Sequence, residues 1–286
     1  MSRLLVIMIL LGLVSEANGQ RIYNYYRPGD WVSFTNSRYV TGIGRGFNTI
    51  YFATTGGILR YDKAFDKWLD PLTVSDGMPD NRIRRIAVDR LTDDIWVETP
   101  SGNSYFNPGF QDWSTIANFP TEKIEPAGIS VNQLPHFFVP QGYSYFSPGI
   151  LTDREMAQFR ITQILEDDNG IAWMGIWGIG PAKGDLAISD LAVLPQGPYD
   201  DDIVAMDADG DEFWFLGGGD GLPGAISAYN RSNSEWGVLR FTLGPRNQLR
   251  YLLCRGTRCQ ECLDWHREWI GQNGPQIAGI SIVQPV

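Results

Sequence analysis

A pattern that recurs every forty to forty-five residues constrains the fold of this chain more than any other feature. The stretch IYFATTGGILRYD at residues 50–62 can be superposed on IWVETPSGNSYFNP at residues 95–108. A constant offset of 45 residues relates Thr54 to Thr99, Gly57 to Gly102, Tyr61 to Phe106 and Trp68 to Trp113. Each stretch places two apolar runs around a glycine turn, which predicts a β-hairpin. In the first stretch we expect strands at 50–54 and 58–61, joined by a turn at Gly56 and Gly57.

Further copies of the hairpin follow along the chain. They are FFVPQGYSYFSP (137–148), IAWMGIWG (171–178), EFWFLGGG (212–219) and, more weakly, EWIGQNG (268–274). Apolar segments that run into an acidic turn precede several copies, namely IRRIAVD (83–89), ITQILED (161–167) and DIVAMDAD (202–209). Four short strands per unit of this length is the period of a β-propeller blade. We expect strands at 83–89, 94–99, 102–107 and 112–118 in the second blade.

The fold class predicted from these repeats is all-β, a β-propeller of four-stranded antiparallel blades, with six blades. The N-terminal segment DWVSFT (30–35) resembles EWGVLRFT (235–242), the fourth-strand segment of a later blade. We therefore expect residues 30–35 to supply the fourth strand of blade six and to close the ring, which would cover an open sheet edge. Blade six itself, about 243–286, is irregular in sequence. The alternative is that the chain is a piece of a longer propeller protein.

The first nineteen residues have the pattern of an export signal. Arg3 is followed by an apolar run from Leu4 to Val14 and by Ala17-Asn18-Gly19, a small-x-small cleavage site. The apolar run is shorter than the ~20 residues that a membrane-spanning helix needs. We expect a signal peptide at 1–19 and one β-propeller domain at 20–286, exported to the periplasm or to the extracellular surface. No later segment reaches transmembrane length, so we expect no stable membrane insertion of the mature chain.

The net charge of −10 limits the classes of partner. An acidic protein lacks the bulk attraction that draws nucleic acids and anionic membrane surfaces to basic proteins. We therefore expect no nucleic-acid partner.

One repeat is close to the pattern of a known family. In SDGMPDNRIRRIAVDRLTDDIWVETPSG (75–102) the matching positions are Gly77, Pro79, Asn81, Ile83, Ile86, Asp89, Trp96, Thr99 and Gly102, with Met78 and Glu98 as departures. This stretch is similar to the two-component-regulator propeller repeat, and the copy around Trp173 matches in part. The resemblance implies a propeller of the kind found in extracytoplasmic sensor regions of bacterial hybrid histidine kinases. The chain carries no kinase or regulator segment, so the resemblance implies a signalling role only as one possibility.

Acidic turns and cysteines are the two candidate metal sites. Asp207, Asp209 and Asp211 begin like a calcium-binding loop, but Glu212 stands where the sharp-turn glycine belongs and Gly218 where the bidentate Glu belongs. Acidic residues recur at the same place in other repeats, and we interpret them as turn-forming residues.

Three cysteines, Cys254, Cys259 and Cys262, lie close to His266. They could form one disulfide with one thiol left over, or supply zinc ligands with His266, whereas an iron–sulfur site would lack its fourth cysteine. A third alternative is that residues 251–268 are an insertion or a sequence error. We predict no metal and no cofactor.

Catalytic motifs are absent from the sequence. The two histidines are His136 and His266, and no nucleophile elbow or zinc-protease motif occurs. We therefore predict no catalytic residues and no enzymatic activity, and leave the binding residues unassigned. The function expected is recognition of a small molecule, glycan or protein at the mouth of the central channel. The alternatives are a polysaccharide-active enzyme and a surface or secretion-associated scaffold.

Overall fold

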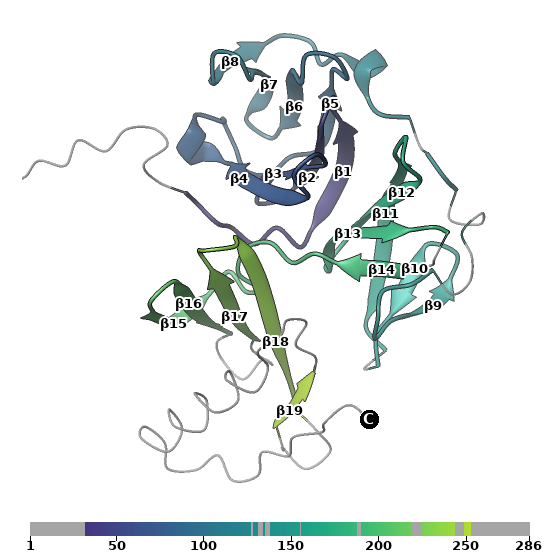
Figure 1. Cartoon of the computed structure of the whole chain (residues 1–286). Coiled ribbons are helices and arrows are strands. Elements are labelled where there is room, and N and C mark those ends of the chain that lie inside the picture. Colours follow the sequence, from purple (N-terminus) through teal and green to yellow (C-terminus); the bar gives the residue numbers. More distant parts are fainter. Residues whose placement is uncertain are drawn as a thin grey trace, which may run out of the picture. The chain divides into compact units, whose positions relative to one another are not determined.

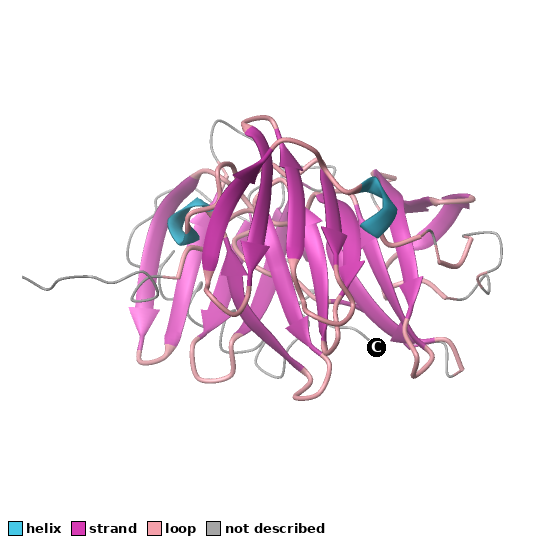
Figure 2. Cartoon of the chain, turned by 90° about the horizontal axis from the view of Figure 1, so that it is seen from above, coloured by secondary structure: helices cyan, strands magenta, loops and turns pink. Residues whose placement is uncertain are grey.

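The computed structural model describes residues 32–126, 128–130, 134, 138–154, 156–187, 190–218, 225–243 and 249–252. Within these residues the chain forms four antiparallel sheets and two single-turn helices, η1 (Val74–Asp76) and η2 (Thr121–Lys123) (Figures 1 and 2). In this part of the chain no helix is long and apolar enough to cross a membrane. The prediction of an all-β chain with four-stranded, blade-like sheets is confirmed. The predicted signal peptide lies outside the described residues.

The first sheet contains the hairpin with which the sequence analysis began. Its strands, in spatial order, are β1 (Val40–Arg45), β2 (Thr49–Thr54), β3 (Gly57–Asp62) and β4 (Lys67–Leu72). At the β2–β3 turn the Thr54 hydroxyl accepts a hydrogen bond from Gly56 N at 2.9 Å and donates one to Gly57 O at 2.8 Å. Gly57 has a φ of 123°, and a Cβ there would lie 2.6 Å from Leu72 O. Glycine is required because a side chain would be both strained and blocked.

The second sheet repeats the first. Its strands are β5 (Arg85–Val88), β6 (Ile95–Thr99), β7 (Gly102–Asn107) and β8 (Asp112–Ile116), each within two residues of the boundaries predicted for the second blade. The Thr99 hydroxyl donates to Gly102 O at 2.8 Å, and Gly102 has a φ of 122°. The turn chemistry of Thr54 and Gly57 therefore recurs 45 residues later, as the sequence predicted.

The third sheet corrects the blade prediction. It has the order β14-β13-β12-β11-β10-β9. Its strands are β9 (Ser144–Ser147), β10 (Ile150–Thr152), β11 (Gln158–Glu166), β12 (Ile171–Ile176), β13 (Gly180–Asp185) and β14 (Asp190–Val193). The repeat at 137–148 was expected to form its own blade, yet β9 and β10 join this sheet instead. The physical reason is that β11 is nine residues long: β12 pairs from Ile161 onward, and β10 pairs with residues 158–160.

The fourth sheet consists of β15 (Ile203–Asp209), β16 (Glu212–Gly217), β17 (Ala225–Asn230), β18 (Glu235–Leu243) and β19 (Leu249–Leu252), in that order. Residues 249–252 were expected in a sixth blade, but they pair with the second half of β18. The remainder of the predicted blade six lies outside the described residues, and a count of six blades stays a prediction.

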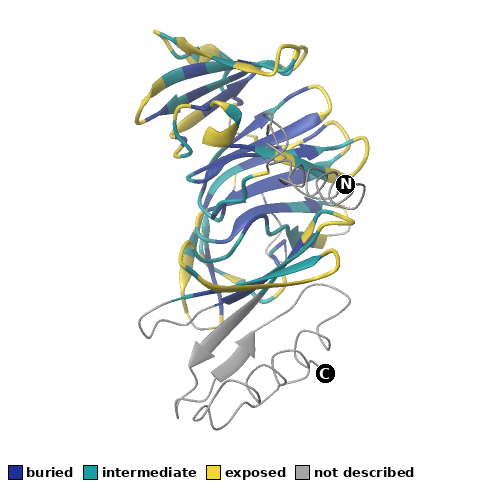
Figure 3. Ribbon diagram, turned by 90° about the vertical axis from the view of Figure 1, so that its left-hand side faces the viewer, coloured by how far each residue is buried: buried dark blue, intermediate teal, exposed yellow. Residues whose placement is uncertain are grey.

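The first sheet is buried on both faces. Along β2, Tyr51 and Ala53 belong to a core shared with Ile86 and Val97 of the second sheet. The alternate residues Ile50 and Phe52 belong to a core shared with Leu165 and Trp173 of the third sheet. Buried residues accordingly concentrate in the strands, while exposed residues mark the turns (Figure 3). This two-sided burial requires apolar side chains at consecutive positions of β2.

Trp173 lies at the centre of the core between the first and third sheets. Its ring centroid is 5.0 Å from that of Tyr61 and 6.3 Å from that of Phe52. Its Nε1 donates to Asp167 Oδ2 at 2.9 Å, so the polar atom of this buried ring is satisfied.

Residues 32–38, which we call the strap, do not form the strand predicted for the N-terminal segment (Figure 1). Phe34 packs on Tyr229 and Trp236 of the fourth sheet, with ring centroids 4.9 and 5.1 Å apart. The Thr35 hydroxyl donates to Gly56 O of the first sheet. Short polar side chains of the strap form hydrogen bonds with the backbone of neighbouring loops. Such side-chain hydrogen bonds compete with the backbone hydrogen bonds that would pair the segment into a sheet. The strap therefore contacts the sheets through its side chains.

We predict that Phe34→Ala lowers the stability of the protein by about 1–2 kcal/mol, less than the ~3–5 kcal/mol of a fully buried Phe, because Phe34 is half-buried. Phe65→Ala is the matched control, since Phe65 is 74 % exposed. Urea denaturation would measure both. Equal midpoints for the two variants would contradict the structural role of the strap.

Candidate functional site

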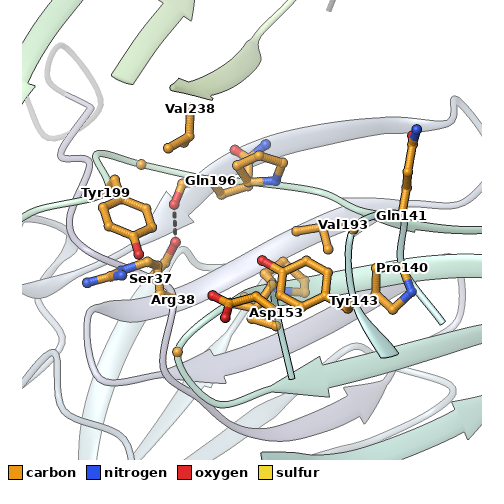
Figure 4. A pocket seen from close by; sticks show the side chains of 17 residues that line it. Ser37, Arg38, Pro140, Gln141, Tyr143, Asp153, Val193, Gln196, Tyr199 and Val238 are labelled. Carbon is orange, nitrogen blue, oxygen red and sulfur yellow. Dashed lines mark hydrogen bonds between the residues drawn. The ribbon is translucent and has the colours of Figure 1, made fainter. Parts of the chain in front are cut away.

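A pocket of about 140 Å³ opens where the strap meets loops of the third sheet (Figure 4). Its walls come from the strap, the 140–143 turn before β9, residue 153 after β10, the β12–β13 turn at 178–181 and the segment 193–199. Val238 of β18 contributes from the fourth sheet. Connecting segments brought together by a rigid scaffold are the usual location of binding residues.

Hydrogen bonds fix these walls to one another. Gly178 N donates to Arg38 O at 3.0 Å, and the Ser37 hydroxyl donates to Gln196 O. Gly197 has a φ of 80°, and a Cβ at this position would lie 2.1 Å from Thr35 O. Only glycine allows the strap to approach so closely, because a side chain would be strained and would collide with the strap backbone.

Arg38 and Tyr199 form one side of the pocket. The guanidinium carbon of Arg38 lies 3.6 Å from the centroid of the Tyr199 ring, and Arg38 Nε donates to Asn36 Oδ1 at 3.3 Å. Tyr199 N donates to the Ser227 hydroxyl at 2.8 Å. The positive charge of Arg38 is therefore held against an aromatic face, an attraction between cation and ring quadrupole.

Asp153 is the one carboxylate among the residues that line the pocket. It is 7 % exposed, and its Oδ1 accepts a hydrogen bond from Ala157 N at 2.9 Å. Tyr143 also lines the pocket, packed edge-on against Phe159 with ring centroids 5.7 Å apart. The pocket thus combines one anionic and one cationic side chain with aromatic, polar and apolar ones, a lining suited to binding through shape, hydrogen bonds and charge.

Asp89 and Asp167, two of the acidic residues singled out in the sequence, accept hydrogen bonds within turns. Asp89 Oδ1 accepts from Leu91 N at 2.9 Å, and Asp167 Oδ1 accepts from Asn169 N at 2.9 Å and Ile171 N at 3.1 Å. Asp207 instead lies within β15, opposite Trp214 of β16, and its Oδ1 accepts from Ala208 N at 2.9 Å. Across the described ranges, no three His, Cys, Asp or Glu side chains come together in a way that could hold a metal ion.

The remaining candidates from the sequence are the three cysteines and the two histidines. Cys254, Cys259, Cys262, His266 and His136 all lie outside the described residues. The binding site expected at the mouth of a central channel stays a prediction.

Sequence reasoning did not identify the residues of the pocket. Ser37, Arg38, Asp153 and Tyr199 stand in connecting segments and share no position in the repeat. The one sequence feature that could have pointed to the pocket is the Gly-Ile-Gly turn at 178–180, because glycines let backbone segments approach closely.

Comparisons with known proteins find similarity in structure alone. No protein-family model and no curated protein matches the sequence. The extracellular domain of BT4673 from B. thetaiotaomicron, described as a one-component system, is 15 % identical with a TM-score of 0.25, over 75 % of this chain and 35 % of that chain. PorZ, a surface component of the type-IX secretion system of Porphyromonas gingivalis, is 13 % identical with a TM-score of 0.24, over 77 % and 40 %.

The tricorn protease is 12 % identical, with a TM-score of 0.21, over 70 % of this chain and 26 % of that chain. The chain therefore spans well under half the length of these three proteins. An extracellular domain of a one-component system, a secretion component and a protease differ in function, and similarity at this level assigns none of these functions to the chain.

Two aspartates of the β5–β6 turn have pKa values shifted in opposite directions. Hydrogen bonds from Lys123 and then from Leu91 N lower the pKa of Asp89 to about 2. Burial raises the pKa of Asp93, although hydrogen bonds from Tyr51 and Phe47 N oppose the rise. A carboxyl group whose pKa is lowered on folding stabilises the protein at pH values above its unfolded-state pKa of about 3.9. This stabilisation is lost as pH falls through the folded-state pKa. A raised pKa has the opposite effect, because stability is lost as pH rises through the folded value.

We predict that Asp89→Asn and Asp93→Asn change stability with opposite dependence on pH. Over the range from about pH 2 to pH 7, Asp89→Asn loses stability relative to the parent protein mainly between pH 2 and about pH 5, because the pKa of Asp89 is about 2 in the folded state and about 3.9 in the unfolded state. Asp93→Asn becomes progressively more stable than the parent, because an asparagine can accept the same two hydrogen bonds without a buried charge. Urea midpoints measured across this range would show two slopes of opposite sign. Parallel slopes would contradict the assignment.

Proposed function

We propose that this chain is an exported, non-catalytic recognition module of the propeller type, which binds a small molecule, a glycan or a protein segment at the pocket beside the strap. Export rests on residues 1–19, which have the charged start, apolar run and small-residue cleavage site of a signal peptide. Sensor-like recognition rests on the resemblance of residues 75–102 to the regulator propeller repeat.

The observation that carries the proposal is the construction of the pocket. Separate connecting segments meet there, and hydrogen bonds such as Leu194 N to Pro181 O, at 2.9 Å, hold them in place. A preformed concave site with few polar groups is the common form of a ligand pocket, because little ordering is needed on binding.

The lining supports binding over the alternative of a polysaccharide-active enzyme. Glycoside hydrolysis commonly uses two carboxyl groups about 5–10 Å apart. Asp153 has no second carboxylate beside it among the lining residues. The Ser37 hydroxyl is committed to Gln196 O and has no histidine in the lining to activate it.

A second candidate, a surface scaffold, is favoured by one observation. Phe65 and Phe110 occupy equivalent positions in the β3–β4 and β7–β8 turns and are 74 and 83 % exposed. In each turn the phenylalanine N donates to the preceding Asp62 or Asn107 Oδ1, at 3.1 Å in both cases. The two rings are therefore presented in the same way by two adjacent repeats.

We predict that a ligand screen by thermal shift on the purified chain finds a compound that stabilises it through the pocket. A ligand at a hundred times its Kd adds about 2.7 kcal/mol. Val193→Phe, which places a larger side chain in the pocket, would abolish that stabilisation at a cost of about 1–3 kcal/mol in overpacking. Val204→Phe is the control, because Val204 is exposed on β15. Ligands that bind both variants equally would contradict the assignment to this pocket, and a screen without any hit would favour the scaffold.

A further inference from the structure

Gln196 places a buried amide in the wall of the pocket (Figure 4). It lies in the segment after β14 and is 8 % exposed. Its backbone O accepts the hydroxyl hydrogen of Ser37, which belongs to the strap. Pro195, whose ring fixes its φ, and Gly197, which packs against the strap backbone, hold it from either side. The backbone that carries this amide is therefore fixed in position.

The amide itself is open to a ligand. In the part of the chain that the structure describes, the side chain of Gln196 makes no hydrogen bond, and the one bond of this residue goes to its backbone O. Neither of its amide atoms is sealed away from solvent, so the exposed fraction of this residue includes the amide. A largely buried amide gains free energy from a partner that satisfies both its donor and its acceptor.

Resting on the proposed function, we propose that the pocket selects neutral ligands with an N–H and a C=O on one edge, as in primary carboxamides and lactams, and that Gln196 pairs with this edge. The glutamine side chain offers an NH₂ donor and a carbonyl acceptor side by side. Gln196 Nε2 would donate to the ligand carbonyl, and the ligand N–H would donate to Gln196 Oε1. Water can also bond to this amide, so a ligand that displaces water gains affinity only if it reproduces both hydrogen bonds.

The geometry of the two hydrogen bonds narrows the class of ligand. Both bonds form at once only when the N–H and the C=O of the ligand point the same way. In the trans amide of a peptide bond these two groups point in opposite directions, so such an amide can make one of the two bonds at a time. Primary carboxamides and lactams have the required arrangement.

The charged side chains of the lining favour a neutral ligand because the protein already engages them. Arg38 lies against the Tyr199 ring, and its Nε donates to Asn36 Oδ1. Asp153 accepts from Ala157 N and takes part in further interactions within the chain. A charged ligand would have to compete with these contacts, whereas a neutral donor–acceptor edge meets an amide that has none.

The size of the pocket limits what accompanies the amide edge. A volume of about 140 Å³ is close to that of an apolar cavity that holds one benzene ring. Ile179, Val193 and Val238 contribute apolar side chains to the wall. The ligand portion that enters the pocket is therefore one small lactam ring or a short apolar group with a primary carboxamide.

Three neutral five-membered rings test this inference on the full purified chain. Pyrrolidinone is a lactam with both groups on one edge, N-methylpyrrolidinone has its donor blocked, and cyclopentanone has the carbonyl without the nitrogen. In titrations followed by saturation-transfer NMR, we expect pyrrolidinone to bind about 5- to 100-fold more tightly than either analogue. This is the range expected when one lost hydrogen bond leaves a buried polar group without a partner.

Two methionine variants locate the effect. Gln196→Met keeps the length of the side chain and the backbone O that accepts from Ser37, but it removes the amide, and it should remove the preference for pyrrolidinone. Gln111→Met removes an amide from the exposed β7–β8 turn of the second sheet and should leave the preference unchanged. A circular dichroism spectrum identical to that of the parent protein would show that Gln196→Met is folded.

The outcomes separate this inference from the proposed function. Equal binding of the three rings, or a preference for pyrrolidinone that survives Gln196→Met, would overturn the inference while leaving a binding pocket in place. If none of the three probes binds, the inference is also overturned, and the proposed function is then judged by the wider ligand screen. A preference for pyrrolidinone that Gln196→Met removes and Gln111→Met retains would establish Gln196 as the residue that pairs with the amide edge.

Discussion

The side chains of β2 alternate between two hydrophobic cores, and the arrangement of the neighbouring sheets follows from this alternation. Ile50 and Phe52 pack toward the third sheet, while Tyr51 and Ala53 pack toward the second. A strand whose two faces are both apolar cannot be stable in a sheet that has one face in water, because burial of each large apolar side chain contributes about 1.5–3 kcal/mol. The first sheet therefore requires a covering layer on each side.

The third sheet also needs a covering layer on each face, and the segment that contains β9 and β10 covers one of them. Ile171 and Trp173 of β12 face the first sheet, whereas Met174 and Ile176 face a second core that includes Phe138 and other buried residues. Leu151 of β10 belongs to that core. The segment that does not form a blade of its own thus still covers an apolar face of the third sheet, through Phe138 and Leu151.

The parts of the fold that the sequence predicted are those encoded within one repeat. The end of a strand and the direction of the turn are determined by one threonine and one glycine in each repeat, Thr54 and Gly57 in the first and Thr99 and Gly102 in the second. Both the threonine hydroxyl hydrogen bond and the positive φ of the glycine depend only on residues within the turn. Sheet membership is not local. The pairing of β10 with residues 158–160 depends on the length of β11, and the strap depends on the loops that its side chains reach. Neither is visible in a periodic pattern.

The candidate site was not predictable for a related reason. Its residues come from segments far apart in sequence, and the nearest of them to the N-terminus, Ser37 and Arg38, belong to the strap. The strap is at once a clamp between sheets and a wall of the pocket, since Phe34 and Thr35 contact the fourth and first sheets while Arg38 lies against Tyr199. A ligand that contacts this wall binds only when the strap is in place. Ligand binding and the docking of the strap are then linked thermodynamically, so each must stabilise the other.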